Sequence, residues 1–119
     1  MQLDCKGRYS YTEEEVKKVV MKQPGNYILL VKRKNENYRS VYVGKADPLE
    51  ERLLEHFSNK EPNSCIKNHI KEHIMGMRYC YVDSEVDRKN IEHTLYHHYD
   101  RECNEKEPEG RKIDINFPF

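Results

Sequence analysis

Five side chains are spaced so that they can act together on an anionic oxygen substrate: Tyr27, Tyr42, Lys45, Arg52 and His56. Residues 41–43 have the character of a β-strand, and the segment that follows is typical of a helix that carries Arg52 and His56 one turn apart. A second strand with an early tyrosine lies upstream, so the two strands are expected to form a hairpin with all five side chains at one end. Arginine and lysine bind phosphate oxygens, while tyrosine and histidine can transfer protons. The set therefore suits a phosphodiester.

The charge balance indicates how strongly the chain could bind nucleic acid. The chain has 119 residues, 21 Lys+Arg and 21 Asp+Glu, so it has the length of one domain and a net charge of zero. A strong nonspecific nucleic-acid binder usually has a basic excess, which this chain lacks. Residues 25–60 nevertheless contain more basic than acidic residues, and residues 84–119 show the reverse. We therefore expect a locally positive face and an acidic C-terminal third.

The cysteines and the apolar runs indicate the compartment. Cys5, Cys65, Cys80 and Cys103 contain no Cys-x-x-Cys pair, so a zinc site is not expected, and each is expected to be a small core or surface residue. Such cysteines fit a reducing cytoplasm. The longest apolar run, residues 27–31, is too short to span a bilayer, and no signal-peptide pattern opens the chain. The expectation is a cytoplasmic protein with no membrane partner.

Capping and hydrophobic patterns predict an α+β fold with a three-stranded antiparallel sheet packed by helices. Thr12, Asp47 and Ser84 are each followed by an acidic residue three positions later, as at helix N-termini. Residues 1–10 lack periodicity and are expected to be irregular. The expected elements are a helix at 12–22, strands at 26–33 and 38–44, helices at 47–57 and 66–75, a strand at 77–83 and a helix at 84–103, and residues 113–117 are expected either to form a short edge strand or to dock on the domain.

This order, together with five short sequence elements, resembles the GIY-YIG nuclease family. Gly25-Asn26-Tyr27 stands where the family has Gly-Ile-Tyr, and Tyr42-Val43-Gly44 stands where it has Tyr-Ile-Gly. Arg52 falls at the position of the family's helix arginine, Glu92 at its metal-binding glutamate, and Asn104 at its late asparagine. The first half looks most like the nuclease domain of bacterial nucleotide-excision-repair endonucleases.

The resemblance also implies how the chain is divided. It places an N-terminal lead and helix at 1–22, a GIY-YIG-like domain at 23–105 and a C-terminal tail at 106–119. Asn26 departs from the isoleucine or valine that is usual beside the first tyrosine. The nuclease-like part occupies most of the chain, so the resemblance implies a stand-alone catalytic domain.

The activity that the resemblance implies is metal-dependent endonucleolytic hydrolysis of DNA. A single Mg²⁺ or Mn²⁺ would be held by Glu92, Arg52 would clamp a nonbridging phosphate oxygen, and Asn104 would orient Glu92 or a phosphate. Either Tyr27 or Tyr42 would accept the proton of the attacking water.

A tyrosine acts as a base near neutral pH only if a nearby positive charge lowers its pKa. Lys45, Arg52 and the metal are the candidates for that charge, and His56 would relay the proton. The residues leave open which tyrosine is the base.

Other interpretations remain at this point. The same fold would suit a catalytically silent nucleic-acid-binding module or a protein-interaction adaptor. If the chain is a nuclease, DNA is the expected partner, and a homodimer or a targeting partner protein would supply specificity for repair, mobile-element or defence roles. The histidine pairs 69/73 and 93/97 have the i, i+4 spacing of metal ligands, but the sequence offers neither pair an evident third ligand.

Overall fold

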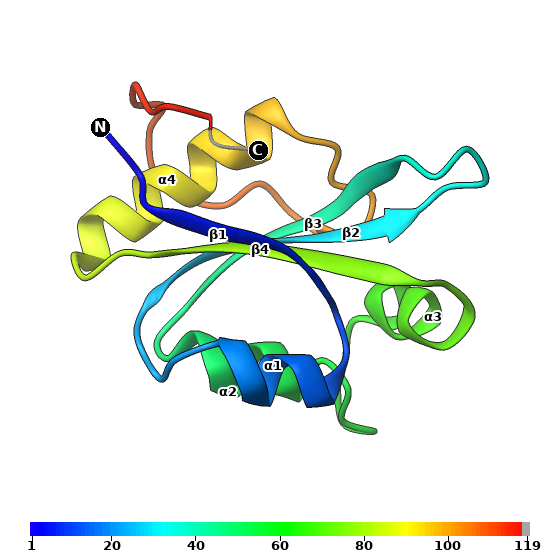
Figure 1. Ribbon diagram of the computed structural model, residues 1–119. Helices are drawn as coiled ribbons and strands as arrows, with labels where there is room; N and C mark the ends of the chain where they lie inside the picture. The colour runs from blue at the N-terminus through cyan, green and yellow to red at the C-terminus, as the bar shows by residue number, and fades with distance from the viewer. Residues whose placement is uncertain (118–119) are drawn as a thin grey trace.

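A four-stranded antiparallel sheet lies between two layers of helices (Figure 1). The computed structural model describes residues 1–117. The elements are β1 (Cys5–Ser10), α1 (Glu13–Val19), β2 (Gly25–Lys32), β3 (Tyr38–Ala46), α2 (Leu49–Glu55), α3 (Ser64–Glu72), β4 (Met75–Tyr81) and α4 (Glu85–His98). The strand order is β1-β4-β2-β3, which makes β3 an edge strand. The predicted α+β class is confirmed.

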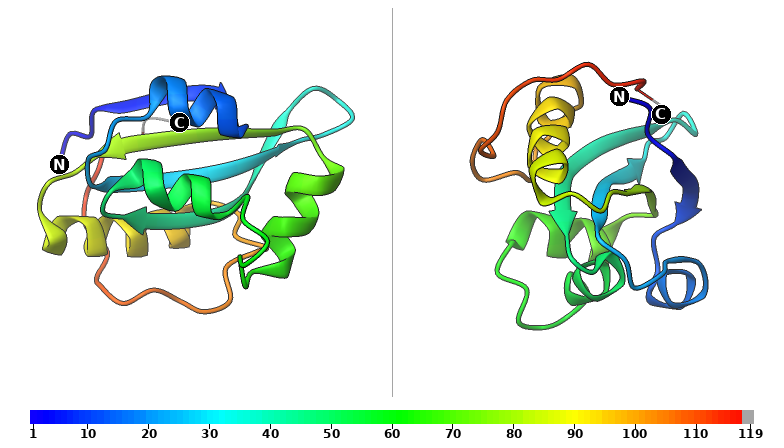
Figure 2. Two further views of the ribbon diagram at one scale, coloured as in Figure 1. Left: turned by 90° about the horizontal axis from the view of Figure 1, so that it is seen from below. Right: turned by 90° about the vertical axis from the view of Figure 1, so that its left-hand side faces the viewer.

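Alternation along β2 divides its side chains between two cores. Tyr27 and Leu29 join the cluster that includes residues of α1, α2 and α3, whereas Ile28 joins the cluster with Ile91 and Leu95 of α4. Figure 2 shows the corresponding layers, with α4 on one face of the sheet and α1 and α2 on the other. A strand with apolar residues on both faces must be covered on both sides, as the sequence indicated for β2.

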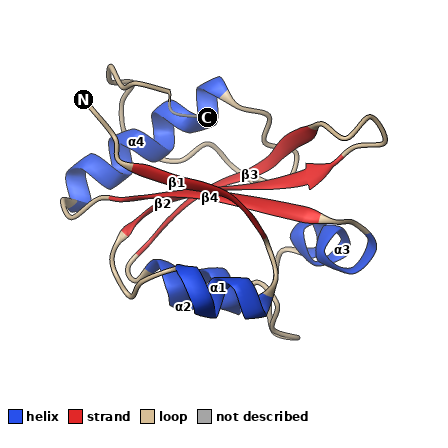
Figure 3. Cartoon of the chain, in the orientation of Figure 1, coloured by secondary structure: helices blue, strands red, loops and turns tan. Residues whose placement is uncertain are grey.

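The sheet has one more strand than expected. Residues 5–10, expected to be irregular, form β1, which pairs antiparallel with β4 at the edge of the sheet (Figure 3). The alternation of this segment is weak because most of its side chains are exposed. Its pairing partner lies about seventy residues away, and no local pattern can indicate such a pairing. The three-stranded sheet of the prediction is therefore corrected to four strands.

The caps were predicted with mixed success. The Thr12 and Ser84 hydroxyls accept hydrogen bonds from the backbone N–H groups of Glu15 and Asp87, as predicted. The prediction for Asp47 was wrong, because Pro48 is the N-cap residue of α2 and makes no side-chain cap bond. Helices α1, α2, α3 and α4 all end earlier than predicted, at Val19, Glu55, Glu72 and His98.

The cysteines form two disulfides, so the expectation of unpaired cysteines was wrong. Cys5–Cys80 joins β1 to β4, and Cys65–Cys103 joins α3 to the segment after α4. Each bond closes a long loop, of 75 and 38 residues respectively. Sequence spacing alone does not reveal such pairs, because the partners meet only when the sheet and α3 have formed.

The C-terminal segment docks on the α4 face rather than adding a strand. Ile113 and Ile115 pack against the cluster formed by Ile28, Ile91 and Leu95. Pro118 and Phe119, the last residues of the predicted tail, lie outside the described residues. No helix within residues 1–117 has both the length and the apolar character needed to cross a membrane.

Asn26 forms a buried hydrogen bond between the sheet and a helix. Its side chain is buried, and its amide nitrogen donates to the backbone oxygen of Arg88 in α4 at 3.0 Å. This polar residue thus ties β2 to α4.

Candidate active site

A cleft of about 550 Å³ lies beside the edge strand β3. Tyr42 of β3, Arg52 of α2, Glu92 of α4 and Asn104 of the following segment all line it. Helices α2 and α4 pack on opposite faces of the sheet, and side chains from both reach one cleft because β3 has a neighbour on only one side. The cleft is completed by Glu61, Pro62, Asn63, Glu105, Lys106 and Pro108. Four of the residues singled out from the sequence therefore share one site.

Tyr27 and His56 form a hydrogen-bonded pair beneath the cleft. The Tyr27 hydroxyl lies 2.8 Å from His56 Nε2, and both side chains are buried. The Tyr42 ring lies over this pair, with its centroid 6.0 Å from that of Tyr27 and 5.6 Å from that of His56. Neither Tyr27 nor His56 lines the cleft, so these two predicted site residues contact it only through the Tyr42 ring.

Glu61 is a central residue of this site that the sequence analysis missed. Its carboxylate is only 1% exposed; Oε2 lies 3.3 Å from Nη1 of Arg52 and 3.2 Å from Nδ1 of His56. The other oxygen accepts the backbone N–H of Asn63 at 3.2 Å. Glu61 lies in the irregular segment between α2 and α3, where no periodic pattern or family motif distinguishes it from a solvent-exposed glutamate.

The two motif tyrosines are both neutral but differently placed. Burial raises the pKa of Tyr27 well above its ordinary value, and Tyr42 adds to the effect. Burial also raises the pKa of Tyr42, while the adjacent Arg52 guanidinium acts to lower it. Of the two tyrosines, only Tyr42 is among the residues that line the cleft.

His56 is held in its neutral form. Burial, followed by the positive charge of Arg52, lowers the pKa of His56 to about 4, although Glu61 acts in the opposite direction. A neutral imidazole carries one N–H and one free lone pair. Nε2 has the Tyr27 hydroxyl as its hydrogen-bond partner, whereas Nδ1 lies 3.2 Å from Oε2 of Glu61 without forming a hydrogen bond.

Glu92 has the surroundings of a cation ligand. Burial raises the pKa of its carboxyl group, and the nearby charge of Lys45 partly offsets that rise. Lys45 itself is exposed and is not among the residues that line the cleft. Within residues 1–117, the Glu92 carboxylate accepts no hydrogen bond, in contrast to that of Glu61. A half-buried carboxylate without a donor is costly unless a cation compensates it, so the donor fits a hard divalent ion.

Asn104 holds the edge strand rather than Glu92. Its side chain accepts from the backbone N–H of Val43 and donates to the backbone oxygen of the same residue, both at 2.9 Å. Neither bond involves Glu92, one of the two groups that Asn104 was expected to orient. Asn104 thus fixes the segment after α4 beside the Tyr42-Val43-Gly44 motif.

Each histidine pair has an acidic neighbour that the sequence analysis did not identify. Glu102 lies beside His69, and Glu107 lies 2.6 Å from Nε2 of His97 and 3.9 Å from Nε2 of His93. Both glutamates lie in the segment that follows α4; Glu102 contacts α3, and Glu107 contacts α4. The third partner comes from long-range packing, which the i, i+4 spacing alone did not indicate.

Comparison with known proteins identifies sequence relatives of this chain. The family model for the UvrC-like GIY-YIG domain matches residues 23–104. "UvrABC system protein C" of Thermoanaerobacter sp. (strain X514) is 30% identical over 108 residues, which cover 91% of this chain and 16% of that protein. The protein of the same name from Methanococcus maripaludis is 33% identical over 85 residues, 71% of this chain and 15% of that protein. The chain thus spans about one sixth of the length of these relatives.

Solved structures show the same fold. One is the GIY-YIG N-terminal endonuclease domain of UvrC from Thermotoga maritima, a tyrosine-to-phenylalanine mutant bound to its catalytic divalent cation. It superimposes with a TM-score of 0.60 and 22% identity, covering 80% of this chain and all of that one. A second mutant of that domain gives a TM-score of 0.57 and 21% identity, with the same coverage.

Proposed function

The chain belongs to the UvrC-like GIY-YIG domain family, and we propose that it is an endonuclease that hydrolyses phosphodiester bonds in DNA with one divalent cation. The observation that carries this proposal is the shared cleft of Tyr42, Arg52 and Glu92. The three residues come from β3, α2 and α4, and their side chains supply a proton acceptor, an anion ligand and a cation ligand.

Glu92 would hold the cation, which we propose to be Mg²⁺ or Mn²⁺. Both ions prefer carboxylate oxygen, and the raised pKa of Glu92 is the effect of burial that a bound cation would reverse. When bound, such an ion stabilises the negative charge that develops on the phosphate and on the leaving oxygen. The catalytic divalent cation of the related UvrC domain supports this assignment.

Arg52 would bind a nonbridging oxygen of the phosphate. Glu55 and Glu61 hold its Nη1 at 3.2 and 3.3 Å, which fixes the plane of the guanidinium at the wall of the cleft. A guanidinium presents several donors in one plane, so these contacts leave donors for a phosphate. Glu61 is then a positioning residue for Arg52.

We assign the role of general base to Tyr42 rather than Tyr27. Tyr42 lines the cleft, where a water molecule and a phosphate can approach it, while the Tyr27 hydroxyl is buried against His56. Burial raises the pKa of Tyr42, Arg52 acts in the opposite direction, and a cation bound in the cleft would lower that pKa further. Tyr27 and His56 would hold the Tyr42 ring in position.

DNA is the proposed substrate, and a second macromolecule is proposed to select the site of cleavage. The relatives are components named for the UvrABC system, and this chain matches only about 16% of their length. We propose a DNA-repair role in which a partner protein or a second copy of this chain supplies specificity.

A cleavage assay on several nucleic acids separates the proposal from its alternatives. The purified chain is incubated with supercoiled plasmid, linear duplex, single-stranded DNA and RNA, in Mg²⁺, in Mn²⁺ and in excess EDTA, and binding is measured in parallel. We expect DNA cleavage in either metal and none in EDTA. Binding without cleavage would instead favour a silent binding module, and neither result on any substrate would favour an adaptor.

A further inference from the structure

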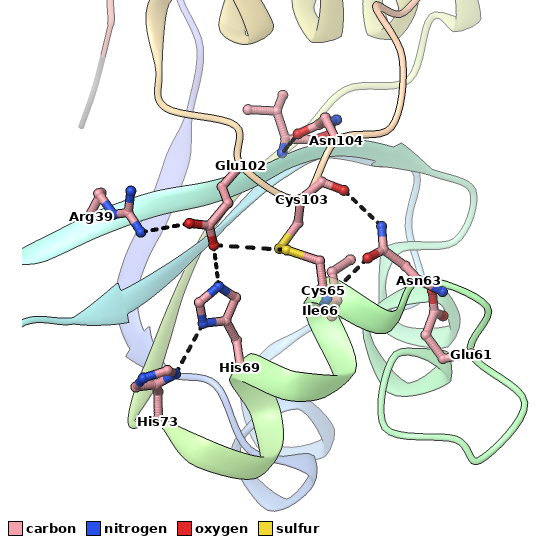
Figure 4. Close-up of a disulfide and its surroundings, with 11 residues drawn as sticks. Arg39, Glu61, Asn63, Cys65, Ile66, His69, His73, Glu102, Cys103 and Asn104 are labelled. Carbon is pink, nitrogen blue, oxygen red and sulfur yellow. Dashed lines mark hydrogen bonds and ion pairs between the residues drawn. A yellow bond between two sulfur atoms is a disulfide. The ribbon is translucent and has the colours of Figure 1, made fainter.

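Four side chains that can bind metal meet where α3 touches the segment after α4 (Figure 4). They are Cys65, His69, Glu102 and Cys103, and none of them lines the cleft. We propose that they form a Zn²⁺ site that becomes available when the Cys65–Cys103 disulfide is reduced. The inference rests on this cluster alone and does not depend on the proposed nuclease activity.

The four ligand atoms are close enough together to share one zinc ion. All of them lie within 4.8 Å of one another. A tetrahedral zinc ion with bonds of about 2.0–2.3 Å requires its ligand atoms to be about 3.3–3.8 Å apart. Reduction allows the two sulfurs to separate, and Nε2 of His69 and Oε1 of Glu102, now 2.5 Å apart, must also move apart. Shifts of about 1–2 Å therefore bring two sulfurs, one nitrogen and one oxygen into the geometry that zinc favours.

The backbone keeps the two halves of the cluster together without the sulfur–sulfur bond. Cys65 and His69 occupy one face of α3 because they are four residues apart. On the other side, the backbone N–H of Cys103 donates to the Val41 oxygen at 2.7 Å, and its oxygen accepts from Nδ2 of Asn63 at 2.8 Å. None of these contacts uses a cysteine sulfur, so reduction leaves the four side chains near one another.

Neighbouring side chains orient the two ligands that are not cysteines. Nδ1 of His69 lies 3.1 Å from Nδ1 of His73, while its Nε2 faces Oε1 of Glu102 at 2.5 Å. Nη2 of Arg39 donates to the other oxygen of Glu102 at 3.2 Å. Metal-binding histidines usually have such a partner on the nitrogen that does not bind the metal. Oε1 of Glu102 thus lies between Nε2 of His69 and Sγ of Cys65, at 3.9 Å from that sulfur (Figure 4).

The charges around the group also suit a cation. Nη2 of Arg39 lies 3.2 Å from Oε2 of Glu102, the carboxylate oxygen that does not face His69. Two thiolates and this carboxylate together carry more negative charge than Zn²⁺ neutralises, and the adjacent Arg39 guanidinium offsets the excess.

The chemical steps balance with a dithiol as the reductant. The dithiol transfers two electrons and two protons to the Cys65–Cys103 bond, which yields two protein thiols and the oxidised, disulfide form of the reductant. Binding of Zn²⁺ then releases the two thiol protons to solvent, because the thiolate is the form that binds metal. In the reverse exchange, a disulfide oxidant accepts two electrons from the thiolates and two protons from solvent, which expels the ion and restores the Cys65–Cys103 bond.

Cobalt absorption tests the site, with Co²⁺ as a spectroscopic probe for Zn²⁺. The full chain is reduced with a phosphine, which does not itself supply a thiol ligand, and titrated with Co²⁺ and then with competing Zn²⁺. We expect one equivalent to produce a thiolate-to-cobalt charge-transfer band and the visible absorption of tetrahedral cobalt, and Zn²⁺ to abolish both. In the oxidised chain, metal affinity is expected to fall at least about 100-fold, because the thiolate ligands are missing.

Matched variants identify the ligands. Cys65→Ser and His69→Ala should each weaken Co²⁺ binding at least about tenfold, while the double variant Cys5→Ser/Cys80→Ser should keep the spectrum, although it also loses two thiols. Glu92→Gln should keep it as well, so the test is separate from the nuclease proposal. Circular dichroism checks that each reduced variant stays folded.

Three results would overturn the proposal. The first is folded, reduced wild-type protein that gives no charge-transfer band. The second is a charge-transfer band that survives Cys65→Ser. The third is Co²⁺ binding that shows no charge-transfer band and is abolished by His97→Ala, because His93, His97 and Glu107 form a separate group without sulfur.

Discussion

The two tyrosines of the motif have different surroundings although they lie on one face of neighbouring strands. Tyr27 is buried and bonded to His56, and Tyr42 faces the cleft with Arg52 and Glu92. The sequence placed both tyrosines at the site but left the choice of base open. Burial and hydrogen bonding separate them, and both depend on the packing of α2 against the sheet.

Phenylalanine substitutions distinguish the roles of the two tyrosines. Tyr42→Phe should lower the turnover number about 100-fold or more, because a general base contributes about 10²–10⁴ to rate. Tyr27→Phe should chiefly lower the melting temperature, since it leaves His56 Nε2 without its buried partner. Single-turnover cleavage and thermal unfolding measure the two effects. Larger loss of turnover in Tyr27→Phe than in Tyr42→Phe would reverse the assignment.

His56 should make stability depend on pH. Its pKa is lowered to about 4 from an ordinary value of 6.5, so between these values the unfolded chain binds a proton that the folded chain does not. The free energy of unfolding is therefore not reduced by His56 above pH 6.5, and it falls as the pH is lowered from 6.5 toward 4. Urea unfolding from pH 4 to 8 should show a smaller dependence in His56→Gln than in the wild type.

A second histidine variant controls that measurement. His73 is exposed, so His73→Gln should leave the pH dependence close to that of the wild type. If His56→Gln retained the full wild-type dependence, the imidazole would not be held neutral by its surroundings.

Residues within the family motif were predictable, and those outside it were not. Tyr42, Arg52 and Glu92 could be expected at one site because they match positions of the family motif, and all three line the cleft. Glu61 could not, because its role comes from burial against Arg52 and His56 in an irregular segment. The acidic partners of the histidine pairs were missed for the same reason.

At the scale of elements, the glycines of the motif set how closely the strands and side chains approach. Gly44 pairs with Tyr27 across β2 and β3, and a Cβ at Gly44 would lie 2.5 Å from Cζ of that ring. A Cβ at Gly25 would lie 2.0 Å from the backbone oxygen of Cys80. Both glycines are thus required by packing.

Gly44→Ala should displace the Tyr27 ring and lower the free energy of unfolding by about 1–3 kcal/mol, which is typical of overpacking. Gly76 is the matched control, since a Cβ there would meet the flexible Arg8 side chain at 3.0 Å and can be accommodated. Urea unfolding of both variants gives the comparison. Equal stability of the two would show that the Tyr27 ring is not confined by Gly44.

Element prediction failed where pairing was distant. The strands 25–32 and 38–46 follow one another, so their hairpin was visible in the sequence. Strand β1 pairs with β4, which lies about seventy residues later, and its alternation is weak, so this strand could not be recognised from the sequence. The disulfides also join distant parts of the chain: one links β1 to β4, and the other links α3 to the segment after α4.

At the scale of the molecule, zero net charge limits nonspecific DNA binding. Basic residues near the cleft are few, so about three or four phosphates should be contacted, and the slope of log K against log salt should be about −3. Five acidic residues lie within the segment 100–109 and would repel DNA there: Asp100, Glu102, Glu105, Glu107 and Glu109. Fluorescence anisotropy with duplex DNA in EDTA measures the slope. Tight binding by a monomer with a slope steeper than about −6 would contradict this picture.

The most direct test of the account is plasmid nicking by Glu92→Gln beside Glu105→Gln. Both glutamates line the cleft, and only Glu92 is assigned to the cation. In Mg²⁺ or Mn²⁺, Glu92→Gln should reduce the nicking rate by at least about 10³-fold, because the charge stabilisation that the cation provides would be lost. Glu105→Gln should stay within about threefold of the wild type, and both variants should unfold at the wild-type temperature. Wild-type nicking by folded Glu92→Gln, or undiminished nicking by the wild type in excess EDTA, would contradict the assignment of Glu92 as the ligand of a catalytic cation.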